Sequence, residues 1–304
     1  MKNTFHFYLL LVASCLLQAC GGHEQTNDLS AGWDRICASH GESISCWGYD
    51  KDNPEQSYFF KQEFSEPVVA VGSSHHCVLT NREVSCWGDN NSSQTDVPHL
   101  SNPYALAAGH ESSCALDDTG VVCWGDEIAG QSEALQLSSP RYLVAGLNHV
   151  CAASETRIKC TQKRGIARDY PVPKISGAIR ALVASPESSR ICLQDGNGWQ
   201  CWSDQTTPNI PYGVPGNIRD ALDLDISMKE TCAIVDQEIK CWNSEAVSDE
   251  APEVETLDVF FLNPSRLALS PHEVCVTDDL GLVCVGRTAF GGRNVNVPGY
   301  LLPE

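Results

Sequence analysis

Seven pairs of cysteines recur along this chain with a single spacing, and they constrain its fold more than any other feature. In each pair the second cysteine lies nine positions after the first, and the first members recur every 37 to 43 residues. Self-similarity at a fixed period of this size is typical of a repeat architecture, in which each unit is one small structural element. The pairs are Cys37/Cys46, Cys77/Cys86, Cys114/Cys123, Cys151/Cys160, Cys192/Cys201, Cys232/Cys241 and Cys275/Cys284.

The segment between the two cysteines of a pair has the pattern of a β-hairpin. In the third pair, the turn residues 117–120 stand between two short apolar runs. A two-residue loop at 118–119 sets Cys114 opposite Cys123 as a non-hydrogen-bonded pair, with Cα atoms about 4.5 Å apart. A four-residue loop also keeps the cysteines opposite but changes the pair type. Because a disulfide tolerates Cα separations of about 4.4–6.8 Å, we predict one disulfide across each hairpin.

The same spacing argues against a metal site. Zinc-binding cysteines usually come in pairs two to four residues apart, and the chain after residue 20 contains no Cys-x-x-Cys. All fourteen cysteines of the repeats are assigned to the hairpin disulfides. We therefore expect no free thiol and no metal ligand in the repeat region.

The first residues carry a targeting signal. Residues 1–19 combine Lys2 with an apolar run from Phe5 to Leu17, as in a secretory signal peptide. The sequence 17–20, Leu-Gln-Ala-Cys, resembles the bacterial lipobox, which implies that Cys20 becomes the lipidated first residue. An ordinary signal peptide with an incidental cysteine is the alternative, and residues 12–15 are a weaker second match.

The targeting signal implies a location in the cell envelope. A glycine after the lipidated cysteine implies sorting to the outer membrane, and residues 20–28 then form the lipidated cysteine and a polar tether. The domain would face either the periplasm or the outside. Export to an oxidising compartment agrees with a disulfide-rich chain.

Seven units of about 40 residues, each with a hairpin and flanking apolar runs, predict an all-β fold. We expect a seven-bladed β-propeller over residues 29–304, with four-stranded blades and one disulfide in each blade. A strand from residues 294–298 is expected to close the ring. The Trp that follows the second cysteine in most units is expected to fill the space between blades, with sugar binding as the alternative. The repeats run over about 29–67, 68–103, 104–140, 141–174, 175–215, 216–256 and 257–304.

The repeat resembles that of the regulator of chromosome condensation family, which has seven-repeat β-propellers. The resemblance covers nearly all of the chain after the tether and is strongest in repeats 1 to 3. It rests on Val71-Gly72-x-x-His75, Ala145-Gly146-x-x-His149, Cys114-Ala115-Leu116, Gly120-Val121, Trp47-Gly48, Trp87-Gly88, Trp124-Gly125 and Gly130-Gln131. The later repeats depart from the Trp-Gly pattern, with Thr161-Gln162, Trp202-Ser203, Trp242-Asn243 and Val285-Gly286.

The resemblance implies a function in protein binding. Relatives of this fold act as guanine-nucleotide exchange factors, as chromatin-binding proteins and, in secreted bacterial members, as β-lactamase inhibitors. The nuclear roles do not suit this chain, whose formal net charge of −19 repels nucleic acid.

Enzymatic chemistry has no signature in the sequence. The chain lacks Gly-x-Ser-x-Gly, a glycine-rich phosphate loop, His-Glu-x-x-His and calcium-loop spacing. We therefore expect no catalytic residue, no cofactor and no nucleic-acid partner, and we expect a monomer.

Two groups of charged residues are candidate binding sites. One lies two positions before the first cysteine of a pair, where sevenfold geometry would place the side chains on a ring around the axis. Its members are Arg35, His75, His149, Arg190, Glu230 and Glu273. The alternative is that each side chain satisfies local backbone groups or faces water.

The other group is a basic segment at residues 157–180 in an otherwise acidic chain, with Lys163, Arg164 and Arg168 at its centre. Loops carry function on rigid scaffolds, so this segment could be an interface. A solvated loop is the alternative. Acidic residues crowd the connection between repeats 6 and 7, at Glu245, Asp249, Glu250, Glu253, Glu255 and Asp258.

These observations predict a membrane-anchored, non-enzymatic binding module. Its loops would be presented to a protein partner in the envelope or outside the cell. A propeller that binds carbohydrate or a small ligand is the alternative. An enzyme would require clustered acid and base groups with shifted pKa values.

Overall fold

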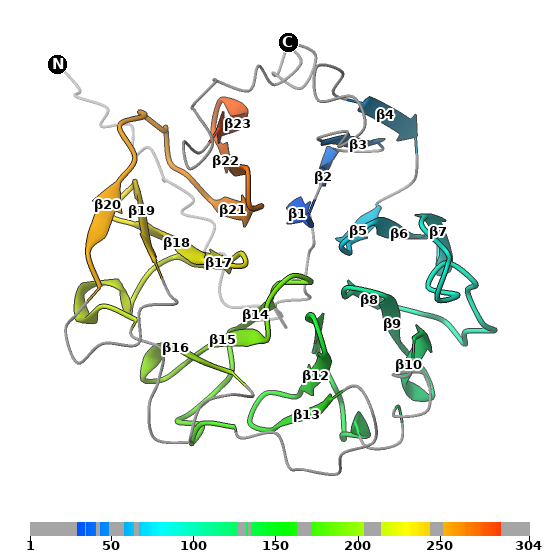
Figure 1. The fold of residues 1–304 in the computed structure, drawn as a ribbon. Helices are drawn as coiled ribbons and strands as arrows, with labels where there is room; N and C mark the ends of the chain where they lie inside the picture. Colours follow the sequence, from blue (N-terminus) through cyan, green and yellow to red (C-terminus); the bar gives the residue numbers. More distant parts are fainter. Residues whose placement is uncertain are drawn as a thin grey trace, which may run out of the picture.

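The computed structural model describes residues 29–33, 35–40, 43–48, 58–63, 67–126, 132, 135–162, 172–203, 214–243 and 252–286. These residues form seven antiparallel sheets arranged in a ring, which confirms the predicted β-propeller (Figure 1). Neighbouring blades touch around the whole ring, and the first blade also touches the last. Within these described stretches, no helix is long and apolar enough to span a membrane.

Each blade is built outward from the axis in chain order. The innermost strands are β1 (Leu29–Ala31), β5 (Val68–Val71), β8 (Ala105–Ala108), β11 (Tyr142–Ala145), β14 (Ala181–Ala184), β17 (Asp223–Ile226) and β21 (Arg266–Leu269). The second strands are β2 (Arg35–His40), β6 (His75–Thr80), β9 (Ser112–Asp117), β12 (His149–Ala153), β15 (Arg190–Asp195), β18 (Glu230–Val235) and β22 (Glu273–Asp278). The third strands are β3 (Ser43–Gly48), β7 (Glu83–Gly88), β10 (Gly120–Gly125), β13 (Ile158–Gln162), β16 (Gly198–Ser203), β19 (Glu238–Asn243) and β23 (Gly281–Gly286).

A fourth, outer strand is present in blades 1 and 6, as β4 (Tyr58–Glu63) and β20 (Val254–Thr256). Blade 2 differs from the expected four strands, because the described segment after β7 forms turns. In that segment Asn90 Nδ2 donates to Asp96 Oδ1 at 2.9 Å, and Gln94 Nε2 donates to Asp89 Oδ2 at 3.1 Å. Short polar side chains that bond locally compete with a sheet ladder, which explains the missing strand. The strand predicted at 294–298 lies outside the described residues.

The hairpin register follows the cysteine spacing. In blade 3 Cys114 pairs with Cys123 across β9 and β10, as the two-residue loop predicts. In blade 4 the loop is longer, yet Cys151 still lies opposite Cys160. The turn residues Asn81 and Arg82 of blade 2 both have positive φ, as a two-residue hairpin turn with the twist of the strands requires.

All seven predicted disulfides are present, with Cα–Cα separations of 4.0–4.1 Å. They join Cys37 to Cys46, Cys77 to Cys86, Cys114 to Cys123, Cys151 to Cys160, Cys192 to Cys201, Cys232 to Cys241 and Cys275 to Cys284. The separations are slightly shorter than the range of about 4.4–6.8 Å used for the prediction, because the pairs lie directly opposite at narrow positions of the ladder.

The first cysteines on the second strands are all buried, and most of the second cysteines on the third strands are core residues, whereas Cys86 and Cys160 are partly buried. Cys46 and Cys241 are each 1% exposed, and Cys201 is 5% exposed. Cys46 packs in the core between blades 1 and 2, Cys201 between blades 5 and 6, and Cys241 between blades 6 and 7. These cysteines are therefore structural residues, and they add nothing to an exposed binding surface.

The hydrophobic core lies between the blades rather than at the axis. In five interfaces the Trp that follows the second cysteine packs against the disulfide of the preceding blade. Trp124, for example, packs against Cys77 and Cys86, and Trp47 packs against Cys275 and Cys284 to close the ring. Trp87, Trp202 and Trp242 occupy the same position at their interfaces. The disulfides therefore staple each hairpin and also supply the surface on which the next blade rests.

Candidate functional site: the blade interfaces and the axial channel

The six ionisable residues predicted to form a ring each occupy the first position of the second strand of their blade. His75, His149, Arg190 and Glu273 are buried, whereas Arg35 and Glu230 are partly exposed. The six residues lie on six different blades, and Arg35, His75 and Arg190 each form a hydrogen bond to the following blade. For these three the alternative of local polar satisfaction is supported, and a ligand-binding role for the six stays a prediction.

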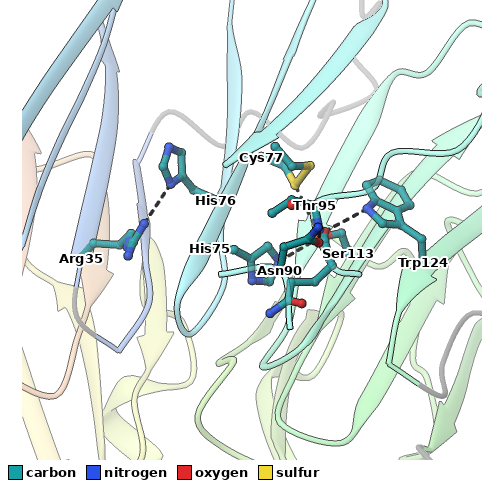
Figure 2. Close-up of a disulfide and its surroundings, with 10 residues drawn as sticks. Arg35, His75, His76, Cys77, Asn90, Thr95, Ser113 and Trp124 are labelled. Atoms are coloured by element: carbon teal, nitrogen blue, oxygen red, sulfur yellow. Dashed lines mark hydrogen bonds between the residues drawn. A yellow bond between two sulfur atoms is a disulfide. The ribbon is translucent and has the colours of Figure 1, made fainter. Parts of the chain in front are cut away.

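His75 joins blade 2 to blade 3 (Figure 2). Its Nε2 lies 2.8 Å from Ser113 Oγ, and that hydroxyl donates to the carbonyl oxygen of Gln94 at 2.9 Å. Because the Ser113 hydrogen is used in this way, His75 Nε2 must carry the donated hydrogen. Burial, with the charge of Arg35, lowers the pKa of His75 to about 4, so the ring is neutral at physiological pH. Trp124 Nε1 donates to the same Gln94 carbonyl at 3.0 Å and completes the interface.

Arg35 makes the equivalent link from blade 1 to blade 2 (Figure 2). Its Nη1 donates to His76 Nδ1 at 3.1 Å, since a guanidinium has no acceptor. The His76 ring stacks on Trp87 with centroids 5.6 Å apart. The arginine therefore positions an aromatic stack at the blade interface.

Arg190 has the largest set of hydrogen bonds described for this group. Its Nη2 donates to the carbonyl oxygens of Ser227 at 2.6 Å and Met228 at 3.1 Å, both in the loop that precedes β18. Its Nη1 donates to Thr231 Oγ1 at 3.3 Å, and its Nε to Ser188 Oγ at 3.2 Å. A planar guanidinium suits this fan of acceptors, so Arg190 fixes blade 6 against blade 5.

His149 and Glu273 are shifted toward their uncharged forms by burial. Burial lowers the pKa of His149 to about 3. Burial raises the pKa of Glu273 to about 7, and the neighbouring Trp47 indole only partly offsets this. In the described part of the chain, Glu273, Cys275 and Cys284 form the one group with metal-ligand spacing. The two sulfurs are joined in a disulfide, so they lack the thiolates that bind a metal.

A small channel of about 190 Å³ lies among the innermost strands of all seven blades. Most of the residues that line it have small or apolar side chains, such as Ala70, Ala107 and Val144. Charged residues break this pattern in blades 5 to 7, with Arg180 just before β14, Asp223 and Asp225 on β17, and Arg266 on β21. The sequence motifs did not indicate a role for Asp223, Asp225 or Arg266, although the Asp-Leu-Asp run at 223–225 stands where other repeats carry small apolar residues.

The two aspartates close the open edge of the neighbouring strand. The innermost strand β21 pairs only with β22, so its other edge faces the axis. Asp223 Oδ2 accepts the N–H of Leu267 at 3.0 Å, and Asp225 Oδ2 accepts the N–H of Leu269 at 2.8 Å. Between blades 1 and 2, Ser30 Oγ accepts the N–H of Val71 in the same way, at 3.0 Å. The spacing of two residues in Asp-x-Asp thus matches the alternation of free N–H groups along a strand edge.

The channel aspartates predict a pH-dependent stability. Burial raises the pKa of Asp225 from 3.8 to about 7, and that of Asp223 to about 6 despite the nearby Arg266 charge. Folding therefore favours the protonated carboxyls, and their contribution to stability is lost as pH rises from about 4 to about 7. Asp225→Asn keeps an oxygen acceptor without the charge, so it should raise the urea midpoint at pH 8 and change it little at pH 4.

His75 and His149 act in the opposite direction, because their lowered pKa values remove stability as pH falls below about 6.5. The comparison of Asp225→Asn with the parent at each pH cancels their effect. Asp118→Asn, at an exposed turn, is the matched control. Equal midpoints for Asp225→Asn and the parent at pH 8 would show that ionisation of Asp225 does not destabilise the fold.

The basic segment is only partly described. Lys163, Arg164 and Arg168 lie outside the described residues. Four basic side chains of the same segment are exposed on blades 4 and 5: Arg157, Lys159, Lys174 and Arg180. This side of the ring therefore presents positive charge in an acidic protein.

The sequence matches no model of a known protein family and no curated protein. Several solved structures share its fold at low identity. The ectodomain of the receptor kinase CR4 from Physcomitrella patens is 18% identical, with 86% of this chain and 72% of that chain covered and a TM-score of 0.55. The crinkly WD40 ectodomain of the receptor kinase ACR4 from Arabidopsis thaliana is 17% identical, with 90% and 98% covered and a TM-score of 0.56.

Yeast RCC1 (Prp20), solved with Kap60, is 14% identical, with 80% of this chain and 77% of that chain covered and a TM-score of 0.55. Likeness at these identities shows the fold alone. It agrees with the resemblance found in the repeat sequence, and the described sheets form a ring of seven blades. The chain therefore has the fold of an RCC1-like β-propeller.

Proposed function

We propose that this protein is a lipid-anchored binding module of the cell envelope that presents propeller loops to a protein partner, without chemical turnover. The observation that carries the proposal is how the charged groups of the protein are divided between buried and exposed positions. The buried ionisable side chains, such as His75 and Arg190, are engaged in joining blades. Many of the exposed charges lie on loops and turns, such as Asp118, Asp258 and Asp279, where a partner could reach them.

Related folds support a role in protein binding. One solved structure of yeast Prp20 is described with its binding to Gsp1p and histones, and another contains Kap60 bound to yeast RCC1. The two receptor kinase domains are ectodomains. The seven disulfides of this chain also favour an oxidising compartment. Together these observations support an exported propeller that acts by binding another protein.

The proposed lipid anchor can be tested by substitution of Cys20. Several acyl chains hold a protein stably on a membrane, whereas a protein without them is released. Cys20→Ser should therefore move the protein from the membrane fraction to the soluble fraction after a salt wash. Cys15→Ser, at the weaker lipobox match, should leave it in the membrane. Retention of the Cys20→Ser variant would refute the lipoprotein assignment.

The basic segment is our candidate for part of the interface, because the sequence concentrates positive charge there and its four described basic side chains are exposed. Opposed charges at an interface mainly set the association rate and the specificity. Reversal of charge at Lys163, Arg164 and Arg168 should slow association with the captured partner at least about tenfold and reduce its salt dependence. The thermal midpoint should stay unchanged. Arg82→Glu, on an exposed turn of blade 2, is the control for net charge. Equal rates in both variants would remove the basic segment from the interface.

A further inference from the structure

The segment that enters blade 7 displays apolar side chains to solvent. It runs from residue 257 to residue 263, between β20 and β21 (Figure 1). Phe260 is 84% exposed, and Val259 and Leu262 are each 37% exposed. Between them Phe261 is 3% exposed and packs in the core cluster of blades 6 and 7. One aromatic ring of the pair thus anchors the segment, while the other projects from it.

Hydrogen bonds hold this segment against the turn between β22 and β23. Leu262 N donates to Asp278 Oδ2 at 2.9 Å, and Asp279 N donates to the Leu262 carbonyl oxygen at 2.9 Å. Leu280, in the same turn, is 57% exposed. Val259, Phe260, Leu262 and Leu280 therefore form one surface, which we call the blade-7 patch. Its exposed side chains stand on a backbone that is held by both the core and the turn.

The surroundings of the blade-7 patch are acidic. Asp258 and Asp279 are exposed beside it, and Glu253 and Glu255 are exposed on the approach from blade 6. From residue 252 to residue 286 the sequence contains a single Lys or Arg, which is Arg266. That guanidinium lies at the axial channel, where its charge partly offsets the rise in the pKa of Asp223 that burial causes. The patch thus combines apolar anchors with a rim of negative charge.

We propose that the blade-7 patch binds a cationic protein segment that carries apolar side chains. Exposed apolar patches with polar rims mark interaction sites, and aromatic side chains at their centre contribute most of the affinity. A rim of carboxylates attracts a basic partner and disfavours an acidic one. This inference rests on the proposed protein-binding function and adds a second contact surface, apart from the basic segment, with the chemistry of the partner segment that it binds.

A second copy of this chain fits the patch less well than a separate partner. The exposed basic residues of the basic segment, Arg157, Lys159, Lys174 and Arg180, lie on blades 4 and 5, away from the blade-7 patch. Docking one surface of a copy onto a different surface of the next is heterologous and generates rings or open filaments. We therefore assign the patch to another protein, and self-association is an outcome of the test.

The test is photo-crosslinking in cells with the full-length protein. Phe260→p-benzoylphenylalanine should crosslink one protein through a peptide with a net positive charge and apolar residues. The same substitution at Tyr104, which is 47% exposed on blade 3, should give no such product. A crosslink to a second copy, a crosslink to an acidic peptide, or no crosslink at position 260 would overturn the proposal.

Affinity gives an independent measurement with the partner that the full-length protein captures. Phe260→Ser should weaken retention of that partner at least about tenfold and leave the thermal midpoint unchanged. Tyr104→Ser should retain the partner fully. If the parent captures a partner that Phe260→Ser still retains, the patch assignment is wrong while the binding function stands. If the parent captures no protein at all, the proposed function itself fails.

Discussion

Reduction of the seven disulfides should unfold the propeller at room temperature. Each disulfide closes a hairpin loop of about ten residues and contributes about 2–3 kcal/mol in the chain-entropy view. Even with incomplete additivity, the sum is comparable with the total stability of about 5–15 kcal/mol that is typical of a folded domain. Reduction also removes the rigid surface on which Trp47 and Trp124 pack. Tryptophan fluorescence and near-ultraviolet circular dichroism of the reduced, alkylated protein should show the loss of packing.

A single pair gives the graded control for this experiment. Cys77→Ser with Cys86→Ser should lower the free energy of unfolding by about 2–3 kcal/mol and leave a folded ring. A reduced and alkylated protein that still unfolds cooperatively, at the midpoint of the oxidised protein, would contradict the account of the disulfides as the main staples of the blades.

Arg190→Ala should be the most damaging single substitution among the interface residues. It removes a buried guanidinium and leaves the carbonyl oxygens of Ser227 and Met228 without this donor. Unsatisfied buried acceptors cost about 1–3 kcal/mol, so a loss of about 3 kcal/mol is expected for the two acceptors and the cavity together. Thermal and urea unfolding should both report it.

Two variants make the Arg190 result specific. Arg190→Lys should recover little of the stability, because a point charge cannot replace a planar fork with several donors. Arg180→Ala removes an exposed arginine and should change the free energy of unfolding by less than about 0.5 kcal/mol. If Arg190→Ala also changed the free energy of unfolding by less than about 0.5 kcal/mol, the packing of blade 5 against blade 6 would not depend on this side chain.

Much of the fold could be predicted because the cysteine spacing is a local quantity. A separation of nine residues determines the register of one hairpin, and its recurrence counts the blades. The same repeat pattern also predicted that the Trp after the second cysteine packs between blades. It overlooked the turns after β7, where Asp89, Asn90 and Gln94 bond to their own segment instead of forming an outer strand.

The candidate sites were harder to predict because they depend on neighbouring blades. The cysteine spacing predicted that His75 and Arg190 occupy equivalent positions in their blades. It did not predict the direction of their side chains, which extend to the next blade and not to the axis. The role of Asp223 and Asp225 depends on the free edge of β21, a strand that comes one repeat later in the chain. Phe260 has no repeat equivalent, so only the structure distinguishes its exposure from the burial of Phe261.

The most direct test of the account is to ask which class of molecule the mature protein binds. The immobilised protein should retain a protein partner from native envelope extract, with salt-sensitive association, and should retain no glycan on an array. A specific glycan ligand in the absence of any protein partner would contradict the account and favour a carbohydrate-binding propeller.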